Sequence, residues 1–391
     1  MDNMTTCRFD NAIAGETLAL SDLQRRISVH TPDDLPAAMA AIDAGRQEGC
    51  WTALLIDYSL GEWLEPALMR CGTMPARDRE ARLTALVFGR AKNIASRTPP
   101  EDPLASRILS LRPRMNFPAY ARQMDKIKGW IEAGNVYQIN YTFPIDVETR
   151  GCPASLYQTL LNRHPVAHAA YLYDEGKHVL SFSPELFLRR EGTRLISRPM
   201  KGTAPRHADP DADWKAARIL QNSAKDRAEN AMIVDLLRND MGKIARVGSV
   251  KVNRLFELES YPSIWTLTST ISADVGHASL LDILKALFPC GSVTGAPKVA
   301  AMRYIQALEH SDRGMYCGSV GWLAPNGDFS LNVAIRTLLL DDTGRGVYGV
   351  GGGIVLDSDP KLEWMECQWK SRILMADNAG TWTRRSPAVA S

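Results

Sequence analysis

The sequence lacks the features that would place this chain at a membrane or on a nucleic acid. None of its apolar runs approaches the roughly 20 residues that a membrane-spanning helix needs. Its first residues, MDNMTTCRFDNAIAG, contain no basic segment followed by an apolar one, so we expect no signal peptide. The 46 Lys and Arg residues nearly balance the 44 Asp and Glu residues, and the net charge of +2 favours neither a nucleic acid nor a membrane surface as a partner.

Cysteine is also scarce. The seven cysteines are odd in number and scattered, without the spacing of a metal site, which predicts reduced thiols and a cytoplasmic protein. What is present fits a globular chain: 45% of the 391 residues are hydrophobic, and this length suffices for one large domain or two ordinary ones.

Helix and strand patterns occur in separate blocks, which favours an α+β fold with largely antiparallel sheets. The turn Pro325-Asn326-Gly327 between two alternating runs predicts a hairpin. The main expected elements are helices over residues 120–136, 211–238 and 360–375, a strand over 137–148, and hairpins over 178–198 and 315–340.

The organisation along the chain has three parts. Residues 1–100 are expected to form an N-terminal portion of the shared fold, and the Pro- and Arg-rich residues 97–120 a connector. The main body covers residues 117–377, and the small, polar residues 378–391 are expected to be a disordered tail.

A lysine in a tight turn is the first candidate for chemistry. The stretch SRPMKGTAPR, residues 197–206, holds Lys201 between Met200 and Gly202. Lys201 is either an ordinary exposed loop lysine or a nucleophile held over a substrate, and an amine attacks only when it is neutral.

Carboxylates on two predicted helices are the second group. Glu363 and Glu366 share a helix face, with Lys370 four residues beyond, and on their own they fit a solvated face with an ion pair. Glu229 falls in register with the apolar Met232, Ile233 and Leu236, so it needs a partner: an arginine or a divalent cation. Oxygen ligands from two helices suit Mg²⁺.

Three further features could serve a bound anion or a proton transfer. Glu185 follows Ser183-Pro184 near a strand edge, where it is either a surface glutamate or, if buried, an acid with a raised pKa. Arg336 alternates with small residues on a strand, which suits either solvent or a carboxylate. Gly351, Gly352 and Gly353 interrupt a strand and allow the backbone to approach a ligand.

Taken together, these features resemble one family. The segments SPELFLR, PMKGTAPR, KDRAENAMIVDLLRNDMGKIA, FPCGSVTGAPK, YCGSVGWL, AIRT and GGGIVLDSDPKLEWMEC occur in the order found in chorismate-utilising enzymes. That family includes anthranilate synthase large subunits, aminodeoxychorismate synthase component I, isochorismate synthases and salicylate synthases. The resemblance covers roughly residues 117–377 and implies two largely antiparallel sheets packed as a sandwich, with helices on the outside.

The resemblance also implies roles for individual residues. Glu229 and Glu366 resemble the Mg²⁺ ligands, with Glu363 close by, and Glu185 resembles the acid that protonates the departing hydroxyl at C4 of chorismate. Lys201 resembles the amine that attacks C2. The implied substrate-binding residues are Gln138, Thr203, Tyr316, Arg336, Gly351, Gly352 and Gly353.

Two positions resemble the aminodeoxychorismate branch. Isochorismate and salicylate synthases have a lysine base where this chain has Gln138, so water is not expected to be activated at C2. Anthranilate synthases usually have alanine where this chain has Lys201. One departure is Thr266, which occupies a position where relatives often have histidine.

The branch implies conversion of chorismate and ammonia to 4-amino-4-deoxychorismate, the precursor of 4-aminobenzoate and folate. No cysteine has the setting of a glutaminase nucleophile, so a separate glutamine amidotransferase subunit is expected to supply the ammonia. The alternatives are an anthranilate synthase-type large subunit and a non-catalytic chorismate-binding subunit.

Overall fold

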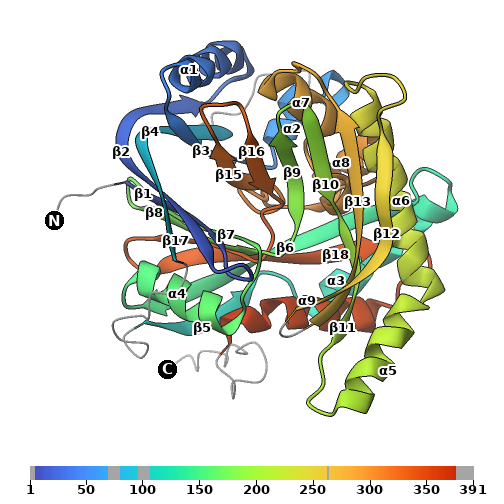
Figure 1. The fold of residues 1–391 in the computed structure, drawn as a ribbon. Coiled ribbons are helices and arrows are strands. Elements are labelled where there is room, and N and C mark those ends of the chain that lie inside the picture. The colour runs from blue at the N-terminus through green and yellow to red at the C-terminus, as the bar shows by residue number, and fades with distance from the viewer. Residues whose placement is uncertain (1–4, 69–79, 96–105, 262–263, 376–391) are drawn as a thin grey trace.

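The computed structural model describes residues 5–68, 80–95, 106–261 and 264–375. Antiparallel strands and surrounding helices make up this part of the chain (Figure 1). The helices are α1 (Leu35–Gln47), α2 (Leu60–Leu64), α3 (Phe117–Glu132), α4 (Pro153–Arg163), α5 (Pro210–Gln221), α6 (Ala224–Gly242), α7 (Leu280–Leu287), α8 (Lys298–Leu308) and α9 (Pro360–Ser371).

The strands are β1 (Thr6–Asn11), β2 (Glu16–Val29), β3 (Trp51–Ile56), β4 (Leu83–Ala95), β5 (Arg107–Pro113), β6 (Gln138–Arg150), β7 (His168–Asp174), β8 (Lys177–Ser183), β9 (Leu186–Glu191), β10 (Arg194–Arg198), β11 (Met200–Pro205), β12 (Lys251–Ser260), β13 (Ile264–Asp274), β14 (Gly295–Ala296), β15 (Ser319–Leu323), β16 (Phe329–Asn332), β17 (Thr337–Asp341) and β18 (Arg345–Ile354). Every pairing among them is antiparallel.

The strands form two layers that hydrogen bonding joins into one network (Figure 1). One layer runs in the order β5, β6, β18, β17, β8 and β7, and the other in the order β3, β15, β16, β9, β10 and β13, with β11 and β12 on either side of β13. β1, β2 and β4 connect them, because β1 pairs with β7 and β4 pairs with β3. The expected α+β fold with antiparallel sheets and outer helices is confirmed.

Apolar side chains fill the space between the layers and beneath the helices. Phe9 and Leu86, on strands that connect the layers, pack in one cluster with Ala170 of β7 and Val320 of β15. A second cluster lies under α6 and α7, and a third lies under α3, α4, α8 and α9.

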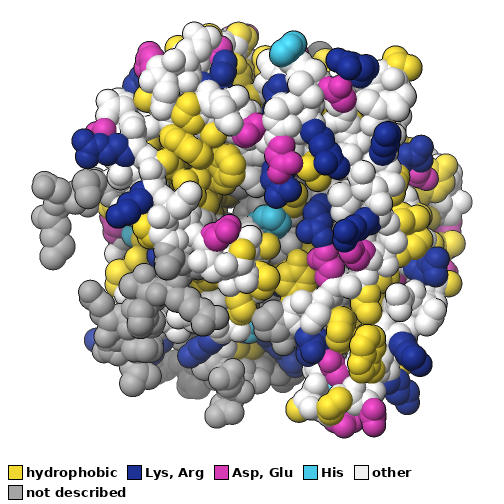
Figure 2. All heavy atoms as spheres, viewed as in Figure 1, with side chains coloured by type: hydrophobic (Ala, Val, Ile, Leu, Met, Phe, Trp, Pro, Cys, Tyr) yellow, Lys and Arg dark blue, Asp and Glu magenta, His cyan; other side chains and the backbone are white. Residues whose placement is uncertain are grey.

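No helix in the described part of the chain is long and apolar enough to cross a bilayer. Lys, Arg, Asp and Glu side chains are interspersed on the face in Figure 2.

Two expected elements are interrupted in the structure. The helix expected over 211–238 is two helices, α5 and α6, because the Ser223 hydroxyl accepts a hydrogen bond from the Asp226 amide and begins α6. The hairpin expected over 178–198 is three strands, because β8 ends before Pro184 and Glu185; only β9 and β10 form a hairpin, which turns at Gly192.

Three other expectations are corrected in part. The hairpin over 315–340 forms between β15 and β16, but residues 333–336 leave the strand and Arg336 has a left-handed φ of 49°. β18 runs uninterrupted through Gly351, Gly352 and Gly353. Part of the expected connector, residues 97–120, is β5, which pairs with β6. The expected tail over residues 378–391 lies outside the described residues.

A buried ion pair joins α6 to the start of α8. The Lys298 ammonium lies 2.6 Å from the Asp240 carboxylate, whose side chain is 2% exposed, and it donates to the Leu287 carbonyl at 2.7 Å. Lys243 contacts the same carboxylate at 2.8 Å but is largely exposed. The lysine of the GAPK segment therefore has a structural contact that ties two helices together.

Lys298→Met is expected to lower the free energy of unfolding by about 3 kcal/mol, because it leaves a buried carboxylate without its buried partner. Lys243→Met is the matched control, and its loss should stay below about 1 kcal/mol, since exposed pairs contribute little. Urea unfolding of both variants measures the difference. Equal losses would show that Asp240 does not depend on Lys298.

Candidate active site

The direction of Lys201 is set by a β-bulge in β11. Lys201 pairs with Leu267 of β13 and Thr203 pairs with Thr266, so Gly202 is the extra residue. Gly202 has a φ of +78°, and a Cβ there would lie 2.9 Å from a carboxylate oxygen of Asp226. Glycine is therefore required.

The bulge separates two predicted site residues. Cross-strand partners share a face of the sheet, and Leu267 and Thr266 point to opposite faces. Lys201 and Thr203 therefore lie on opposite faces of β11, and Thr203 is exposed. The structure does not bring Thr203 together with the lysine.

Two glycines of β18 allow polar side chains to approach the backbone closely. A Cβ on Gly353 would lie 2.3 Å from the amide nitrogen of Gln138 and 3.1 Å from the Lys201 amino nitrogen. A Cβ on Gly352 would lie 3.1 Å from a carboxylate oxygen of Glu363. Gly351 has a different role, because a Cβ there would lie 2.3 Å from the Tyr141 carbonyl oxygen on the paired strand.

Gln138 begins β6 and is fully buried. Neither its amide oxygen nor its amide nitrogen has a hydrogen-bond partner within the described residues. Buried amides are normally satisfied. A side chain with unused donor and acceptor groups beside the Lys201 amine can therefore bind a polar ligand.

Glu185 lies in the short break between β8 and β9. Burial raises the pKa of its carboxyl group to about 7, while Ser292, the nearby charge of Lys201 and the Met200 amide act in the opposite direction. Its Oε1 atom is buried and lacks a hydrogen-bond partner among the described residues. A carboxyl group that keeps its proton near neutral pH can act as a general acid.

Three more carboxylates converge from α6 and α9. Burial and the charge of Glu366 both raise the pKa values of Glu229 and Glu363. Lys370 lies 2.8 Å from Glu366 and is the main cause of that group's lowered pKa. Lys201 lowers the pKa values of Glu229 and Glu366, so its ammonium lies near carboxylates from both helices.

These carboxylates do not form a compact metal cluster. No group of three or more His, Cys, Asp or Glu side chains in the described part of the chain is arranged to hold a metal ion. Glu363 is instead buried and accepts a hydrogen bond from the Ser358 hydroxyl at 2.7 Å. A cation that needs one or two carboxylates, with water for its other ligands, remains compatible with Glu229 and Glu366.

Arg336 is carried by the bend between β16 and β17. The Phe182 amide donates to the Arg336 carbonyl at 3.0 Å, and the Val333 amide donates to the Glu185 carbonyl at 3.1 Å, so the bend runs alongside the segment that carries Glu185. Burial lowers the pKa of Arg336, and no carboxylate of the described residues pairs with it. A desolvated guanidinium without a partner suits an anionic ligand.

Tyr316 is placed differently from the other predicted residues. Its ring packs on Gly349, where a Cβ would lie 2.2 Å from the ring. Tyr316 borders a small cavity that is also lined by Glu309 and Arg313, and neither Lys201 nor Glu185 lines that cavity.

The sequence patterns missed a residue that joins α6, which carries Glu229, to β13. Asn230 is fully buried on α6; its amide accepts a hydrogen bond from the Ser269 hydroxyl at 2.6 Å and donates to the Leu267 carbonyl at 3.3 Å. Of the residues predicted to lie in register with Glu229, Ile233 is buried, whereas Met232 and Leu236 are not, and the buried face of α6 contains Asn230, Ile233 and Leu237. The available signal was the spacing of Asn230, three residues before Ile233 and seven before Leu237, which places it on the same helix face.

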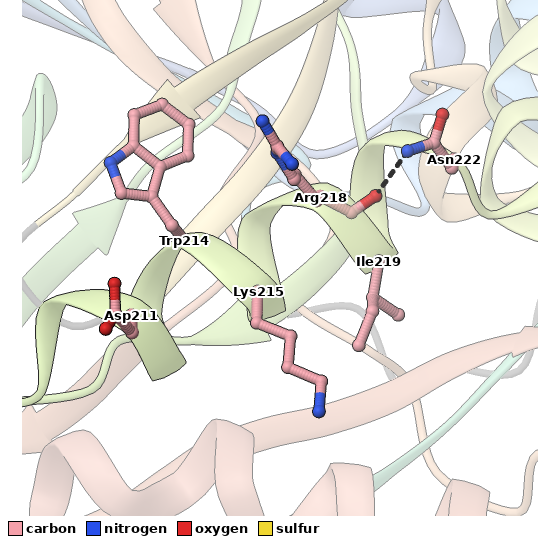
Figure 3. A pocket seen from close by; sticks show the side chains of 6 residues that line it. All are labelled: Asp211, Trp214, Lys215, Arg218, Ile219 and Asn222. Carbon is pink, nitrogen blue, oxygen red and sulfur yellow. Dashed lines mark hydrogen bonds between the residues drawn. The ribbon is translucent and has the colours of Figure 1, made fainter.

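A separate hollow lies on the outer surface of α5 (Figure 3). Trp214 and Ile219 are 60% and 64% exposed there, and Lys215 and Arg218 lie between them on the helix. None of the predicted site residues lines this hollow.

Comparison with known proteins identifies the family of this chain. A family model described as chorismate binding enzyme matches residues 66–376. The chain belongs to the chorismate-binding enzyme family. The match begins before residue 117, where the motifs begin, so this family member includes part of the N-terminal portion in the shared region.

Several curated relatives are similar over a shorter stretch. Aminodeoxychorismate synthase component 1 of Escherichia coli is 42% identical over 250 residues, which are 63% of this chain and 54% of that protein. The Salmonella typhimurium protein of the same name is 41% identical with the same coverage. Anthranilate synthase component 1 of Streptomyces coelicolor is 36% identical over 273 residues, 69% of this chain and 52% of that protein. The chain spans about half the length of these relatives.

Solved structures share the fold. Anthranilate synthase component I from Streptococcus pneumoniae has a TM-score of 0.80 and 22% identity, with 92% of each chain covered. The menaquinone-specific isochorismate synthase from Escherichia coli has a TM-score of 0.74 and 15% identity, with 95% of this chain and 89% of that chain covered.

The raised pKa of Glu185 predicts a pH-dependent cost in stability. Its ordinary value is 4.5 and its folded value about 7, so the folded state binds more protons between these pH values and Glu185 destabilises the fold as the pH rises. Relative to the wild type, Glu185→Gln should be more stable by under about 1 kcal/mol at pH 5 and by about 3 kcal/mol at pH 8.

Urea unfolding at the two pH values measures this difference in unfolding free energy between Glu185→Gln and the wild type. Glu191→Gln is the control, because Glu191 is half exposed in an ion pair with Arg189 and should change stability by less than about 1 kcal/mol at either pH. A gap for Glu185→Gln that does not widen with pH would contradict the burial of a protonated carboxyl group.

Proposed function

We propose that this chain is an aminodeoxychorismate synthase component I that converts chorismate and ammonia to 4-amino-4-deoxychorismate. The observation that carries the proposal is the position of the Lys201 amine, against Gly353 and Gln138 and near the carboxylates of Glu185, Glu229 and Glu366. The names of relatives at about 40% identity support the same branch.

In the proposed first step, the neutral Lys201 amine forms a bond to C2 of chorismate. The electron pair of the ring double bond at C2 shifts through the conjugated ring towards C4, and the C4–O bond breaks. The Glu185 carboxyl group gives its proton to the departing hydroxyl, which leaves as water. The Glu185 carboxylate then takes up the extra proton of the substituted lysine nitrogen.

In the proposed second step, ammonia forms a bond to C4. The electrons return through the ring, and the bond between C2 and the Lys201 nitrogen breaks. The Glu185 acid gives its proton to the departing lysine nitrogen and takes one proton from the new ammonium group at C4, which leaves a free lysine amine and a protonated acid. The sum is chorismate plus ammonia giving 4-amino-4-deoxychorismate plus water. This covalent route uses the lysine as a temporary substituent.

The charges of the substrate need partners on the protein. Arg336 is desolvated and without a carboxylate partner among the described residues, so we assign it to a substrate carboxylate. The amide of Gln138 and the backbone of Gly352 and Gly353 would contact the ring side of the substrate, because no Cβ blocks their approach. Tyr316 remains a weaker candidate, since it borders a different cavity.

Glu229 and Glu366 fit a Mg²⁺ ion. Each lies close enough to the other for the charge of Glu366 to raise the pKa of Glu229, and a cation between them would remove that repulsion. Mg²⁺ commonly takes one or two carboxylates and fills its octahedron with water and substrate oxygens. When bound, it would neutralise a substrate carboxylate. Glu363 would support the site from its buried position beside Gly352.

The ammonia is proposed to come from a separate glutamine amidotransferase subunit. The relatives are named component 1, and no cysteine of this chain has the setting of a glutaminase nucleophile. The six cysteines that the structure describes are all free thiols, which supports the proposal that the protein acts in a reducing compartment such as the cytoplasm.

An anthranilate synthase activity is the second candidate, because the relative from Streptomyces coelicolor has that name. Incubation with chorismate, Mg²⁺ and ammonium separates the two. The proposal expects a product that becomes 4-aminobenzoate only when a lyase is added. Fluorescent anthranilate formed without a lyase would overturn it, and chorismate binding without turnover would favour a non-catalytic subunit.

Lys201→Ala is expected to abolish the covalent adduct with chorismate, because it removes the amine that lies against Gly353 beside Gln138. Mass spectrometry of the intact protein with chorismate measures the adduct, and peptide mapping locates it. Lys285→Ala on the exposed side of α7 is the control and should retain the adduct. An adduct that persists in Lys201→Ala would remove the nucleophile from the proposal.

Glu366→Gln is expected to weaken Mg²⁺ binding about tenfold or more, since the neutral amide is a poorer ligand for a hard cation. Glu191→Gln is matched in exposure, at 50% against 48%, and should leave the titration unchanged. Calorimetric titration with Mg²⁺ reports this without turnover. An unshifted midpoint in Glu366→Gln would remove this residue from the proposed metal site.

A further inference from the structure

The bulge that directs Lys201 is held by a buried hydroxyl group. Thr266 of β13 is fully buried, and its side-chain hydroxyl donates to the Gly202 carbonyl at 3.0 Å. Gly202 is the extra residue of the bulge and directly follows Lys201. The hydrogen bond therefore fixes the peptide group at which the side chains of β11 stop alternating regularly between the two faces of the sheet.

The other side of the bulge rests on α6. The carboxylate of Asp226 packs against Gly202, with no room for a Cβ between them. Asp226 lies in the first turn of α6, whose N-cap is Ser223, and the Ser223 hydroxyl accepts a hydrogen bond from the Asp226 amide. Gly202 is thus held between Thr266 of β13 and Asp226 of α6.

We propose that Thr266 is a positioning residue for Lys201, which it aims at Gly353 and Gln138 by fixing the Gly202 carbonyl. The catalytic part of this inference rests on the proposed function, whereas the placement of the lysine does not. Without the hydroxyl, the extra residue can move along β11, and a shift of one residue turns a strand side chain to the opposite face. Lys201 would then leave the backbone of β18 and turn towards solvent.

The same strand supplies a control for simple loss of a hydroxyl group. Thr268 lies two residues from Thr266 on the same face of β13, and it pairs with Met200 next to Lys201. Thr268 is also buried, but its hydroxyl has no hydrogen-bond partner in the described residues. Thr268→Val therefore makes the same chemical change at a neighbouring site without removing a contact to the bulge.

The first experiment measures the position of Lys201 in the free protein. Wild type, Thr266→Val, Thr266→Ser and Thr268→Val are treated with limiting formaldehyde and cyanoborohydride, and peptide mass spectrometry compares methylation of Lys201 with that of the exposed Lys285. Loss of one hydrogen bond should make Lys201 react about three- to tenfold faster in Thr266→Val. Thr266→Ser and Thr268→Val should match the wild type.

Labelling of Lys201 at the wild-type rate in Thr266→Val would overturn the proposal, and so would an equal increase in Thr268→Val. If Thr266→Val does not fold, Gly202→Ala disturbs the same bulge from the side of Asp226 and should give the same increase. Wild-type labelling in a folded Gly202→Ala variant would likewise count against it.

The second experiment measures formation of the chorismate adduct at Lys201. Thr266→Val should slow it about three- to tenfold, with recovery in Thr266→Ser. Absence of the adduct in the wild type would overturn the proposed function, while the labelling result would still decide the role of Thr266. An adduct that forms in Thr266→Val as fast as in the wild type would overturn the catalytic part of the inference alone.

Discussion

The candidate site depends on the absence of a Cβ at two neighbouring positions of β18. Gly353 allows the Gln138 amide and the Lys201 amine to lie against the backbone, and Gly352 does the same for Glu363. Any larger residue at Gly353 would displace Gln138, which is fully buried and has little room to move. Side chains from β6, β11 and α9 lie close together because the two glycines of β18 have no side chains to keep them apart.

The second requirement is a balance of charge between buried groups and the half-exposed Glu366. Burial raises the pKa of Glu185 and lowers that of Arg336, while Lys370 keeps Glu366 ionised. Gln138 and Oε1 of Glu185 have no hydrogen-bond partners in the described part of the protein. Such unsatisfied groups reduce stability, and they are arranged in advance for a polar ligand. A bound dianion would meet donors and a proton that the fold already holds in place.

The sequence predicted the class of fold and most of the elements, because strand and helix periods are local properties. It missed the break at Ser223, although Ser223 followed by Asp226 resembles a helix start, since helix-forming residues lie on both sides. It also missed the bend at Arg336. Alternation of polar and apolar residues continues through that bend, and a left-handed φ leaves no mark in such a pattern.

The reactive residues could be named from the ordered motifs, but their spatial relations could not. PMKGTAPR places Lys201 and Thr203 two residues apart, which in a regular strand puts both on one face. The bulge at Gly202 separates them. Asn230 was missed for a related reason: the letters ENAM draw attention to the carboxylate, whereas packing against β13 selects the amide. Contacts between elements decide these cases.

The mixing of early and late strands has a consequence for shortened forms of the chain. β1 pairs with β7, and β3 pairs with β15, so the first hundred residues fill places inside the sheets that carry the later motifs. A fragment starting at residue 117 would retain every reactive side chain discussed above. It would also carry bare edges on β6, β7 and β15, which lose β5, β1 and β3, and their free amide and carbonyl groups can recruit strands from other copies. We expect such a fragment to aggregate, even though it contains all of the reactive side chains.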